Sequence, residues 1–283
     1  VNVIDTAPVY GFGRSERVVG EAVKNSGQPR ENLALATKVG LEWTEDEKVV
    51  RNTSPERLKK ELEDSLKRLQ VDYIDLYQIH WPDQEVPAED VAQTMKSFMD
   101  SGKIRAVGLS NYNLKQLHEF EKECPVHSLQ PPYNIFERKA CEKTLEYSQQ
   151  KKIVNLCYGA LCRGLLSGKM SMDRKFSEGD LRNADPKFQS PRFQQYLNAV
   201  NELQQYAQEN YGKDVIHLAI RWILDRGPTV ALWGSRKEHQ MDPVGEVSDW
   251  RLTSGDYKEI DAIVEKHIED PVGPEFMAPP HRE

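Results

Sequence analysis

The chain has 283 residues, a hydrophobic share of 38% and a formal net charge of −7 at pH 7, which suit one large α/β domain or two small ones. This acidic balance argues against nucleic acid as a partner, because phosphate binding needs a clustered basic surface. The sequence shows no apolar run long enough to span a bilayer. Its four cysteines have neither CxxC nor zinc-like spacing, which predicts reduced thiols, no metal site and a cytoplasmic protein.

Seven short runs rich in Val, Ile, Leu and Tyr are predicted to be buried parallel strands, because they are continuous rather than alternating in polarity. In chain order they are residues 1–5, 33–39, 73–80, 104–110, 126–130, 153–159 and 229–234.

Helical patterns lie between and after these runs. They cover residues 15–24, 54–69, 87–102, 113–123, 137–151, 193–212, 214–227 and about 254–268. The second pattern shows the reasoning: Ser54 suits the N-cap, Pro55 suits the first helical position, and four leucines form one apolar stripe. Gly102 is the expected C-cap of the third.

The repeated succession of strand and helix predicts a (β/α)₈ TIM barrel, with residues 1–283 as a single domain that lacks its first strand. A doubly wound open sheet is the alternative, but no GxGxxG follows a strand. The sequence begins with Val and inside a strand, so we expect a preceding segment of roughly forty or more residues, the length of a strand–helix unit with a leading hairpin. The long polar excursion at about 168–190 is typical of a functional loop or lid.

Polar or aromatic side chains stand at the exit of each predicted strand, where a βα barrel carries its active site. They are Asp5, Lys38, His80, Ser110 with Asn111, Gln130, Tyr158, and Gly234 with Ser235 and Arg236. Tyr10 lies in the Gly-rich loop just after Asp5. Each residue alone has a structural explanation, such as a helix cap for Asp5. Together, at one rim, they predict an active site.

Over essentially its whole length the chain resembles the aldo-keto reductase superfamily. The matching segments, in the family's order, are IDTAPVYGFGRSE, ATKVG, DYIDLYQIHWPD, IRAVGLSNY, LQPPYNIFER, YGALCRGLLSGK and ALWGSRKEHQ. Within the superfamily it is similar to the bacterial branch of glycerol and sugar-alcohol dehydrogenases and general stress reductases. The segment DPVGPEFMAPP near the C-terminus also resembles members of that branch. The resemblance implies an NAD(P)H-dependent enzyme that interconverts aldehydes or ketones and alcohols.

The family's catalytic tetrad corresponds to Asp5, Tyr10, Lys38 and His80. A free phenol has a pKa near ~10 and is a poor acid at neutral pH, but a neighbouring ammonium lowers that pKa. Lys38 would therefore tune Tyr10, Asp5 would hold Lys38, and a neutral His80 would orient the carbonyl oxygen. Tyr10 would be the general acid in reduction and the base in oxidation.

The resemblance also implies a set of residues that bind the nicotinamide cofactor. In this sequence they are Ser110, Asn111 and Gln130 for the carboxamide, Tyr158 for stacking on the ring, Leu161, Arg163 and Gly164 in the pyrophosphate loop, and Gly234, Ser235, Arg236 and Gln240 for the adenosine 2′-phosphate.

The chain departs from the family's pattern in three places near that cofactor set. Gln240 stands where strictly NADP-dependent members often carry Arg, and Pro243-Val244 replaces the Glu-Asn pair that contacts adenine. Tyr158 is followed by Gly-Ala instead of Ser-Pro. Arg236 still suits a phosphate. We therefore expect NADP as cofactor, with NAD possibly also used.

The substrate is expected to be small: a hydroxyaldehyde, an aldose, glyceraldehyde or a polyol. Two roles are open for the aromatic residues Phe12, Trp43 and Trp81: they line the substrate pocket, or they pack within the protein. A regulatory cofactor-binding subunit on this fold, as in potassium-channel β-subunits, is the alternative function. A barrel that uses Lys38 as a Schiff base is a third. The resemblance implies a monomer. The acidic charge and the lack of a membrane-spanning run lead us to expect no nucleic-acid or membrane partner.

Overall fold

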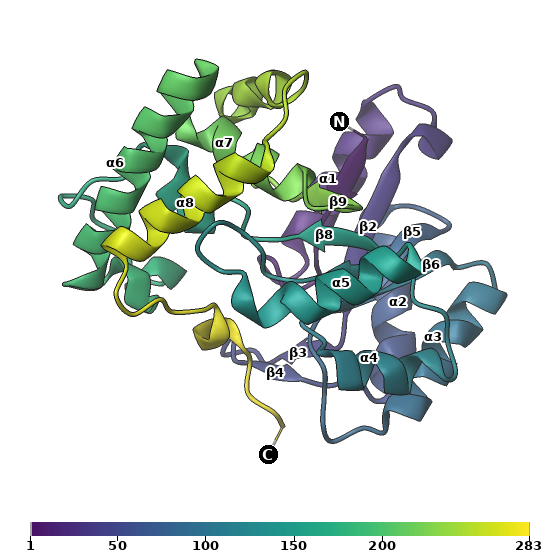
Figure 1. Ribbon diagram of the computed structural model, residues 1–283. Coiled ribbons are helices and arrows are strands. Elements are labelled where there is room, and N and C mark those ends of the chain that lie inside the picture. Colours follow the sequence, from purple (N-terminus) through teal and green to yellow (C-terminus); the bar gives the residue numbers. More distant parts are fainter. Residues whose placement is uncertain (1, 283) are drawn as a thin grey trace. The chain divides into compact units, whose positions relative to one another are not determined.

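The computed structural model describes residues 2–282, without the side chain of residue 140, and its contacts divide the chain into two compact units (Figure 1). Unit 1 comprises Val1–Gln130 and Ala278–Glu283, and unit 2 comprises Pro131–Met277. The prediction of one barrel domain over the whole chain is not tested by this division and stays a prediction. Among the described residues, no helix combines the length and the apolar character that a membrane crossing requires.

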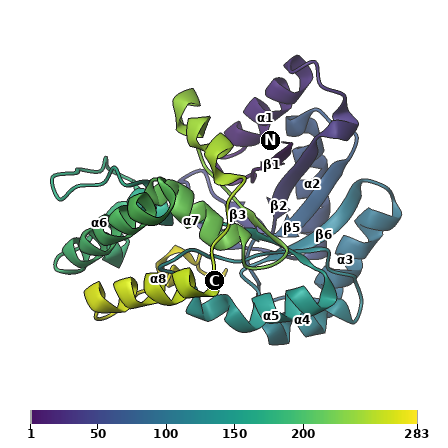
Figure 2. The same ribbon diagram turned by 45° about the horizontal axis from the view of Figure 1, so that its top comes forward.

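Unit 1 is built on five strands that pair in parallel in the order β1, β2, β5, β6, β7. These strands are β1 (Val3–Asp5), β2 (Ala34–Val39), β5 (Ile74–Ile79), β6 (Ile104–Ser110) and β7 (Ser128–Gln130). The helices between them are α1 (Arg14–Asn25), α2 (Pro55–Leu69), α3 (Ala88–Asp100) and α4 (Leu114–Glu121), with a 3₁₀ turn at Arg30–Asn32. Figure 2 shows α2 and α3 on the same side of the strands.

Helix α2 begins as its sequence predicts. The hydroxyl of Ser54 accepts the backbone N–H of Arg57, 3.4 Å away, and Pro55 is the first helical residue. Leu58, Leu62 and Leu69 are almost completely buried, so the predicted apolar stripe faces the interior.

A hairpin that the sequence analysis did not predict follows β2. Its strands, β3 (Leu41–Trp43) and β4 (Val49–Arg51), pair antiparallel. The C-terminal tail docks on this hairpin, because the backbone N–H of Arg51 donates to the carbonyl of Pro280 over 3.0 Å. Arg282 continues the attachment through the amide oxygen of Asn52, at 2.7 Å, and the carboxylate of Asp83.

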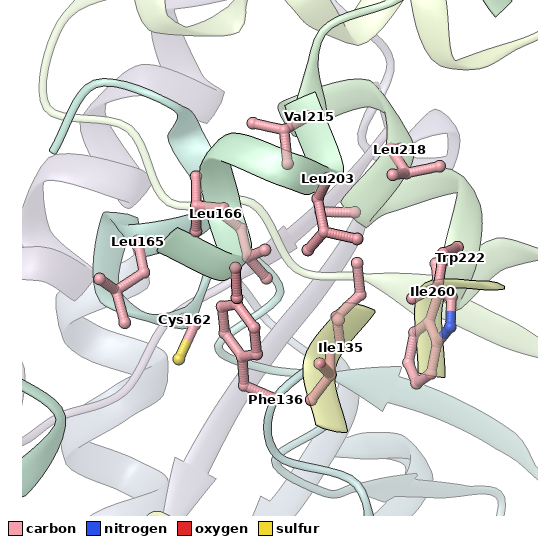
Figure 3. Close-up of a cluster of buried hydrophobic side chains, with 14 of the residues drawn as sticks. Ile135, Phe136, Cys162, Leu165, Leu166, Leu203, Val215, Leu218, Trp222 and Ile260 are labelled. Carbon is pink, nitrogen blue, oxygen red and sulfur yellow. The ribbon is translucent and has the colours of Figure 1, made fainter. Parts of the chain in front are cut away.

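Unit 2 contains two parallel strands, β8 and β9, and the remaining helices. Its elements are α5 (Glu142–Lys151), β8 (Val154–Cys157), α6 (Arg192–Tyr211), α7 (Val215–Leu224), β9 (Thr229–Ala231) and α8 (Ser254–His267), with 3₁₀ turns at Lys139–Cys141, Cys162–Ser167, Leu181–Asn183, Pro186–Phe188, Glu238–Val247 and Glu275–Met277. A core of buried side chains joins them, among them Leu166, Leu203, Val215 and Trp222 (Figure 3).

Each of the seven predicted strands contains an observed strand, so the predicted strand order along the chain is confirmed. The helix expected over 137–151 is regular only from Glu142 onward. The excursion at 168–190 contains two short 3₁₀ turns, and each begins after an aspartate, Asp180 or Asp185, whose side chain accepts a backbone N–H two residues on.

Candidate active site

A fully buried lysine, Lys38 on β2, forms the centre of the site in unit 1. Its ammonium donates to Asp5 Oδ2 at 2.6 Å, to the carbonyl of Thr6 at 2.9 Å, and over a longer 3.4 Å to the phenolic oxygen of Tyr10. An ammonium has three hydrogens, so these three partners use all of them. Burial alone would lower the pKa of Lys38, but the charge of Asp5 and the contact with Tyr10 outweigh it and raise that pKa. The lysine is therefore held in its charged form.

Tyr10 is presented by a tight turn after β1. Gly11, Phe12 and Gly13 all have positive φ, of 60°, 52° and 87°, a conformation that costs a residue with a side chain about 1–2 kcal/mol. The turn is closed by the N–H of Gly13, which donates to the carbonyl of Pro8 over 2.6 Å. The result is a phenol that is 44% exposed while its oxygen touches a buried ammonium.

His80 follows β5 directly and lies beside Tyr10, with ring centroids 5.9 Å apart in an edge-on arrangement. Desolvation, followed by the positive charge of Lys38, lowers the pKa of His80 well below its ordinary value. The imidazole is therefore neutral at neutral pH, in line with the sequence-based expectation. The structure thus brings the four residues of the predicted tetrad together.

The three residues predicted to hold the carboxamide, Ser110, Asn111 and Gln130, lie at the ends of β6 and β7. The hydroxyl of Ser110 donates to the carbonyl of Gln130 at 2.9 Å, and the side-chain amide of Asn111 donates to the carbonyl of His80 at 2.9 Å. The amide nitrogen of Gln130 points to Asp5 Oδ1, 2.9 Å away. Asn111 and Gln130 therefore bond directly to tetrad residues, whereas Ser110 is linked to them only through Asn111 and Gln130. The cofactor role of all three stays a prediction.

The three aromatic residues proposed to line a pocket divide into a pair and a single residue. The rings of Phe12 and Trp43 lie 5.8 Å apart, whereas Trp81 is covered by the guanidinium of Arg51 at 5.4 Å. A cavity of about 200 Å³ beside Trp43 is otherwise lined by charged side chains of α2 and includes no tetrad residue. The pocket-lining role of these aromatic residues stays a prediction.

The predicted pyrophosphate loop belongs to unit 2 and follows β8. Tyr158 is anchored through its backbone, whose N–H donates to the carbonyl of Pro131 and whose carbonyl accepts from Tyr133. After Leu161 the backbone takes three successive residues, Cys162, Arg163 and Gly164, through positive φ. Positive φ is unfavourable for residues with a side chain, so surrounding contacts must hold this turn in place.

Arg163 holds the turn in place through a buried network of ion pairs that the sequence pattern does not predict. Its guanidinium pairs with the carboxylates of Glu137 and Asp185, and only 12% of its side chain is exposed. The ammonium of Lys187, fully buried, reaches the same two acids, at 2.7 Å and 3.4 Å. The guanidinium is committed to these acids, so a contribution of Arg163 to cofactor binding would pass through the shape of the loop.

The last predicted cofactor segment, 234–240, forms an exposed turn in unit 2. The side-chain oxygen of Gln240 accepts the backbone N–H groups of Arg236, at 2.8 Å, and Lys237, at 3.1 Å. The hydroxyl of Ser235 donates to the carbonyl of Lys237 at 2.6 Å. Gln240 therefore stabilises the turn, and the side chains of Arg236 and Lys237 are exposed beside Gly234.

Gln78 is a further residue of this site that the strand exits do not predict; it lies on β5 and contacts both Asp5 and Gln130. A polar residue within the apolar run LYQIH was the available signal. Among the residues that the structure describes, no group of three or more His, Cys, Asp or Glu side chains is arranged to hold a metal ion.

Comparison with known proteins places this geometry in context. The model of the Aldo/keto reductase family matches residues 1–265. The aldo-keto reductase YhdN of Bacillus subtilis is 54% identical over 100% of this chain and 85% of its own length. The NADH-specific methylglyoxal reductase of Escherichia coli is 30% identical over 82% of this chain and 73% of its own length.

A solved structure of a similar protein has the same fold as this chain. The glycerol dehydrogenase AKR11B4 from Gluconobacter oxydans superposes with a TM-score of 0.89 at 46% identity, over 98% of this chain and 85% of that one. The predicted (β/α)₈ fold class is thereby confirmed, and the doubly wound alternative is excluded.

Proposed function

The chain belongs to the aldo/keto reductase family, and on that premise we propose that it interconverts small aldehydes or ketones with the corresponding alcohols or polyols, with Tyr10 as the general acid and base. The observation that carries this proposal is the contact between a buried, charged Lys38 and the exposed phenol of Tyr10. A structural ion pair has no need of that third, solvent-facing partner.

The residues of unit 1 have distinct proposed roles. A bound nicotinamide would supply or accept the hydride. Tyr10 donates the proton to the carbonyl oxygen in reduction and removes it in oxidation. Lys38, kept charged by Asp5, stabilises the phenolate that remains. His80, being neutral, offers a hydrogen bond to the substrate oxygen without adding a second positive charge.

The residues present fit a phosphorylated nicotinamide cofactor. Arg236 and Lys237 expose two adjacent cations on a turn whose backbone donors are already used by Gln240. A phosphate would therefore be held by side-chain charge, for which the guanidinium is well suited. We propose NADP as the preferred cofactor, with NAD also accepted, since a relative is named NADH-specific.

The proposed substrates are hydroxyaldehydes, aldoses and glyceraldehyde, or glycerol-like polyols in the reverse direction. Two similar proteins, named as a glycerol dehydrogenase and a methylglyoxal reductase, support small oxygen-rich substrates. We further propose a monomer acting in the cytoplasm. Its four cysteines are free thiols, as expected in a reducing compartment.

The test compares the wild type with Tyr10→Phe, following NADPH and NADH oxidation with glyceraldehyde. Loss of the phenolic proton should lower kcat by roughly 10²–10⁴-fold, the usual contribution of a general acid. Cofactor binding, followed by fluorescence titration, should remain, because the ring is retained.

Tyr73→Phe is the matched control, since Tyr73 stacks under Arg30 and Arg105 through its ring and has no place in the tetrad. Full activity of Tyr10→Phe would refute the proposed role of Tyr10. Tight cofactor binding without turnover of any carbonyl by the wild type would favour a regulatory subunit instead.

A further inference from the structure

Gln78 is a buried polar residue in the middle of the sheet of unit 1. In the register of the parallel strands it pairs with Lys38 of β2 on one side and with Gly108 of β6 on the other. Neighbours paired in this way project from the same face of a sheet. The Gln78 side chain therefore lies on the face that carries the Lys38 ammonium, and it is completely buried.

The Gln78 side chain belongs to a closed set of hydrogen bonds around Asp5. Asp5 Oδ1 accepts from the amide nitrogens of Gln78, at 3.1 Å, and Gln130, at 2.9 Å. Gln130 also donates to the amide oxygen of Gln78 at 3.1 Å. An ionised carboxylate only accepts hydrogen bonds, so both amides must turn their nitrogens toward it. Asp5 Oδ2 is thereby left for Lys38, at 2.6 Å.

We infer that Gln78 is a positioning residue for the reaction: it fixes the carboxylate of Asp5 so that Lys38 is held against the phenolic oxygen of Tyr10. This inference rests on the proposed function, because it assigns Gln78 to the proton-transfer group proposed above. Among the described hydrogen bonds, none joins Gln78 to Lys38 or Tyr10, so it acts on them through Asp5. A hydrogen bond to a charged group is strong enough to set such an orientation.

Gly108 provides the space that Gln78 occupies. A Cβ atom at this position would lie 2.7 Å from Cγ of Gln78 and 2.5 Å from the hydroxyl of Ser128, both closer than real Cβ contacts. Gly108 on β6, which has no side chain, therefore leaves the space that the amide side chain of Gln78 on β5 fills. This match is independent of the hydrogen bonds, and it indicates that the sheet is built to admit this side chain.

The same network restricts what Gln130 has to offer a ligand. Both hydrogens of its amide nitrogen are used, one by Asp5 and one by Gln78. Its remaining group is the amide oxygen, an acceptor. An acceptor suits the NH₂ group of a nicotinamide carboxamide, the group that Gln130 is predicted to hold, and the bond to Asp5 alone is enough to keep that oxygen free for it.

The decisive variant is Gln78→Met, which keeps the volume and removes both polar atoms. Because Asp5 is held less firmly, we expect kcat to fall roughly ten- to hundredfold, the value of one hydrogen bond to a charge. The midpoint of the pH–rate profile for alcohol oxidation should move to higher pH. Gln130 keeps its bond to Asp5 in this variant, so the KM for NADPH should change little.

Ser128→Ala is the matched control, because Ser128 is buried in the same layer, opposite Gly108, and its hydroxyl has no hydrogen-bond partner among the described residues. Its pH–rate profile should equal that of the wild type. If Gln78→Met does not fold, Gly108→Ala takes its place, since the added methyl group displaces the Gln78 side chain; a shift in the same direction is expected.

An ultraviolet titration of tyrosinate separates this inference from the proposed function. The difference between each protein and its Tyr10→Phe counterpart reports the ionisation of Tyr10 alone and needs no substrate. A higher midpoint in folded Gln78→Met supports the positioning role, even if the wild type reduces no carbonyl. An unchanged midpoint together with an unchanged kcat overturns it, while wild-type turnover leaves the proposed function standing.

Discussion

Units 1 and 2 each contain a lysine with no exposed surface, and the two lysines are surrounded differently. Lys38 in unit 1 faces one carboxylate, Asp5, one backbone carbonyl and the oxygen of Tyr10. Lys187 in unit 2 faces two carboxylates, Glu137 and Asp185, and the carbonyl of Gly273. A second cation, Arg163, shares the same two acids, so two positive and two negative charges balance.

This difference is the one expected between the proposed reactive arrangement in unit 1 and a structural one in unit 2. Buried charges are tolerated when each finds a partner of good geometry, and the network of unit 2 meets this condition internally. In unit 1 the third donor of Lys38 points to a phenol that is 44% exposed. Under the proposed function, a substrate would reach Lys38 and Tyr10 at the position that a structural network would close. A buried ammonium whose third partner is an exposed phenol therefore marks the candidate site more clearly than burial does.

Replacing Lys38 by Met should have the largest effect on activity. The variant removes the charge beside Tyr10, and we expect kcat for NADPH-dependent carbonyl reduction to fall about a thousandfold or more. Its loss of stability should be smaller than for Lys187→Met, because Asp5 keeps the two amide donors of Gln78 and Gln130. Activity close to that of the wild type would remove the distinction between the two lysines.

Lys187→Met should lower stability and leave activity nearly unchanged, the opposite of Lys38→Met. It leaves two buried acids with one cation, Arg163, and breaking a buried ion network typically costs about 3–5 kcal/mol. Urea unfolding should show this loss in the free energy of unfolding, whereas kcat of the folded fraction at saturating cofactor should stay near the wild-type value. A cost within ~1 kcal/mol would show that the closed network contributes little to stability.

Glu61 is a buried carboxyl with a cationic partner, Arg57, and a backbone donor, Gly40. Of the three substitutions, Glu61→Gln should change stability and activity least. Burial raises the pKa of Glu61 to about 7, although Arg57 and the N–H of Gly40 oppose the shift. Between its unfolded pKa of about 4.5 and about 7 the folded protein holds the proton more strongly. Stability therefore falls as pH rises through this window. The variant does not titrate, so its melting temperature relative to the wild type should increase from about pH 5 to about pH 8. The same difference at both pH values would contradict the assignment.

The strands were predictable because each lies within a short, mostly apolar run, and helical patterns alternate with these runs along the chain. The β3–β4 hairpin was not, because LEW and VVR are three residues each and flank a charged turn that resembles a loop. Helix α5 begins later than its pattern because a 3₁₀ turn at Lys139–Cys141 precedes it.

The tetrad could be predicted from strand exits and family resemblance, whereas its support could not. Gln78 resembles an isolated polar residue until the register places it opposite Gly108, 30 residues further along the chain. The partners of Arg163 are equally distant, with Glu137 26 and Asp185 22 residues away. Such pairings depend on three-dimensional packing, which periodicity along a single sequence does not record.

The docking of the C-terminal tail on the β3–β4 hairpin has a consequence for the order in which the protein is made. Asp83 emerges from the ribosome early, but its partner Arg282 is synthesised 199 residues later, after the whole of unit 2. The contacts of Arg51 with Pro279 and Pro280 are delayed in the same way. Unit 1 is thus interrupted by unit 2 in the sequence, and a nascent chain cannot complete its first compact unit until the second has been translated.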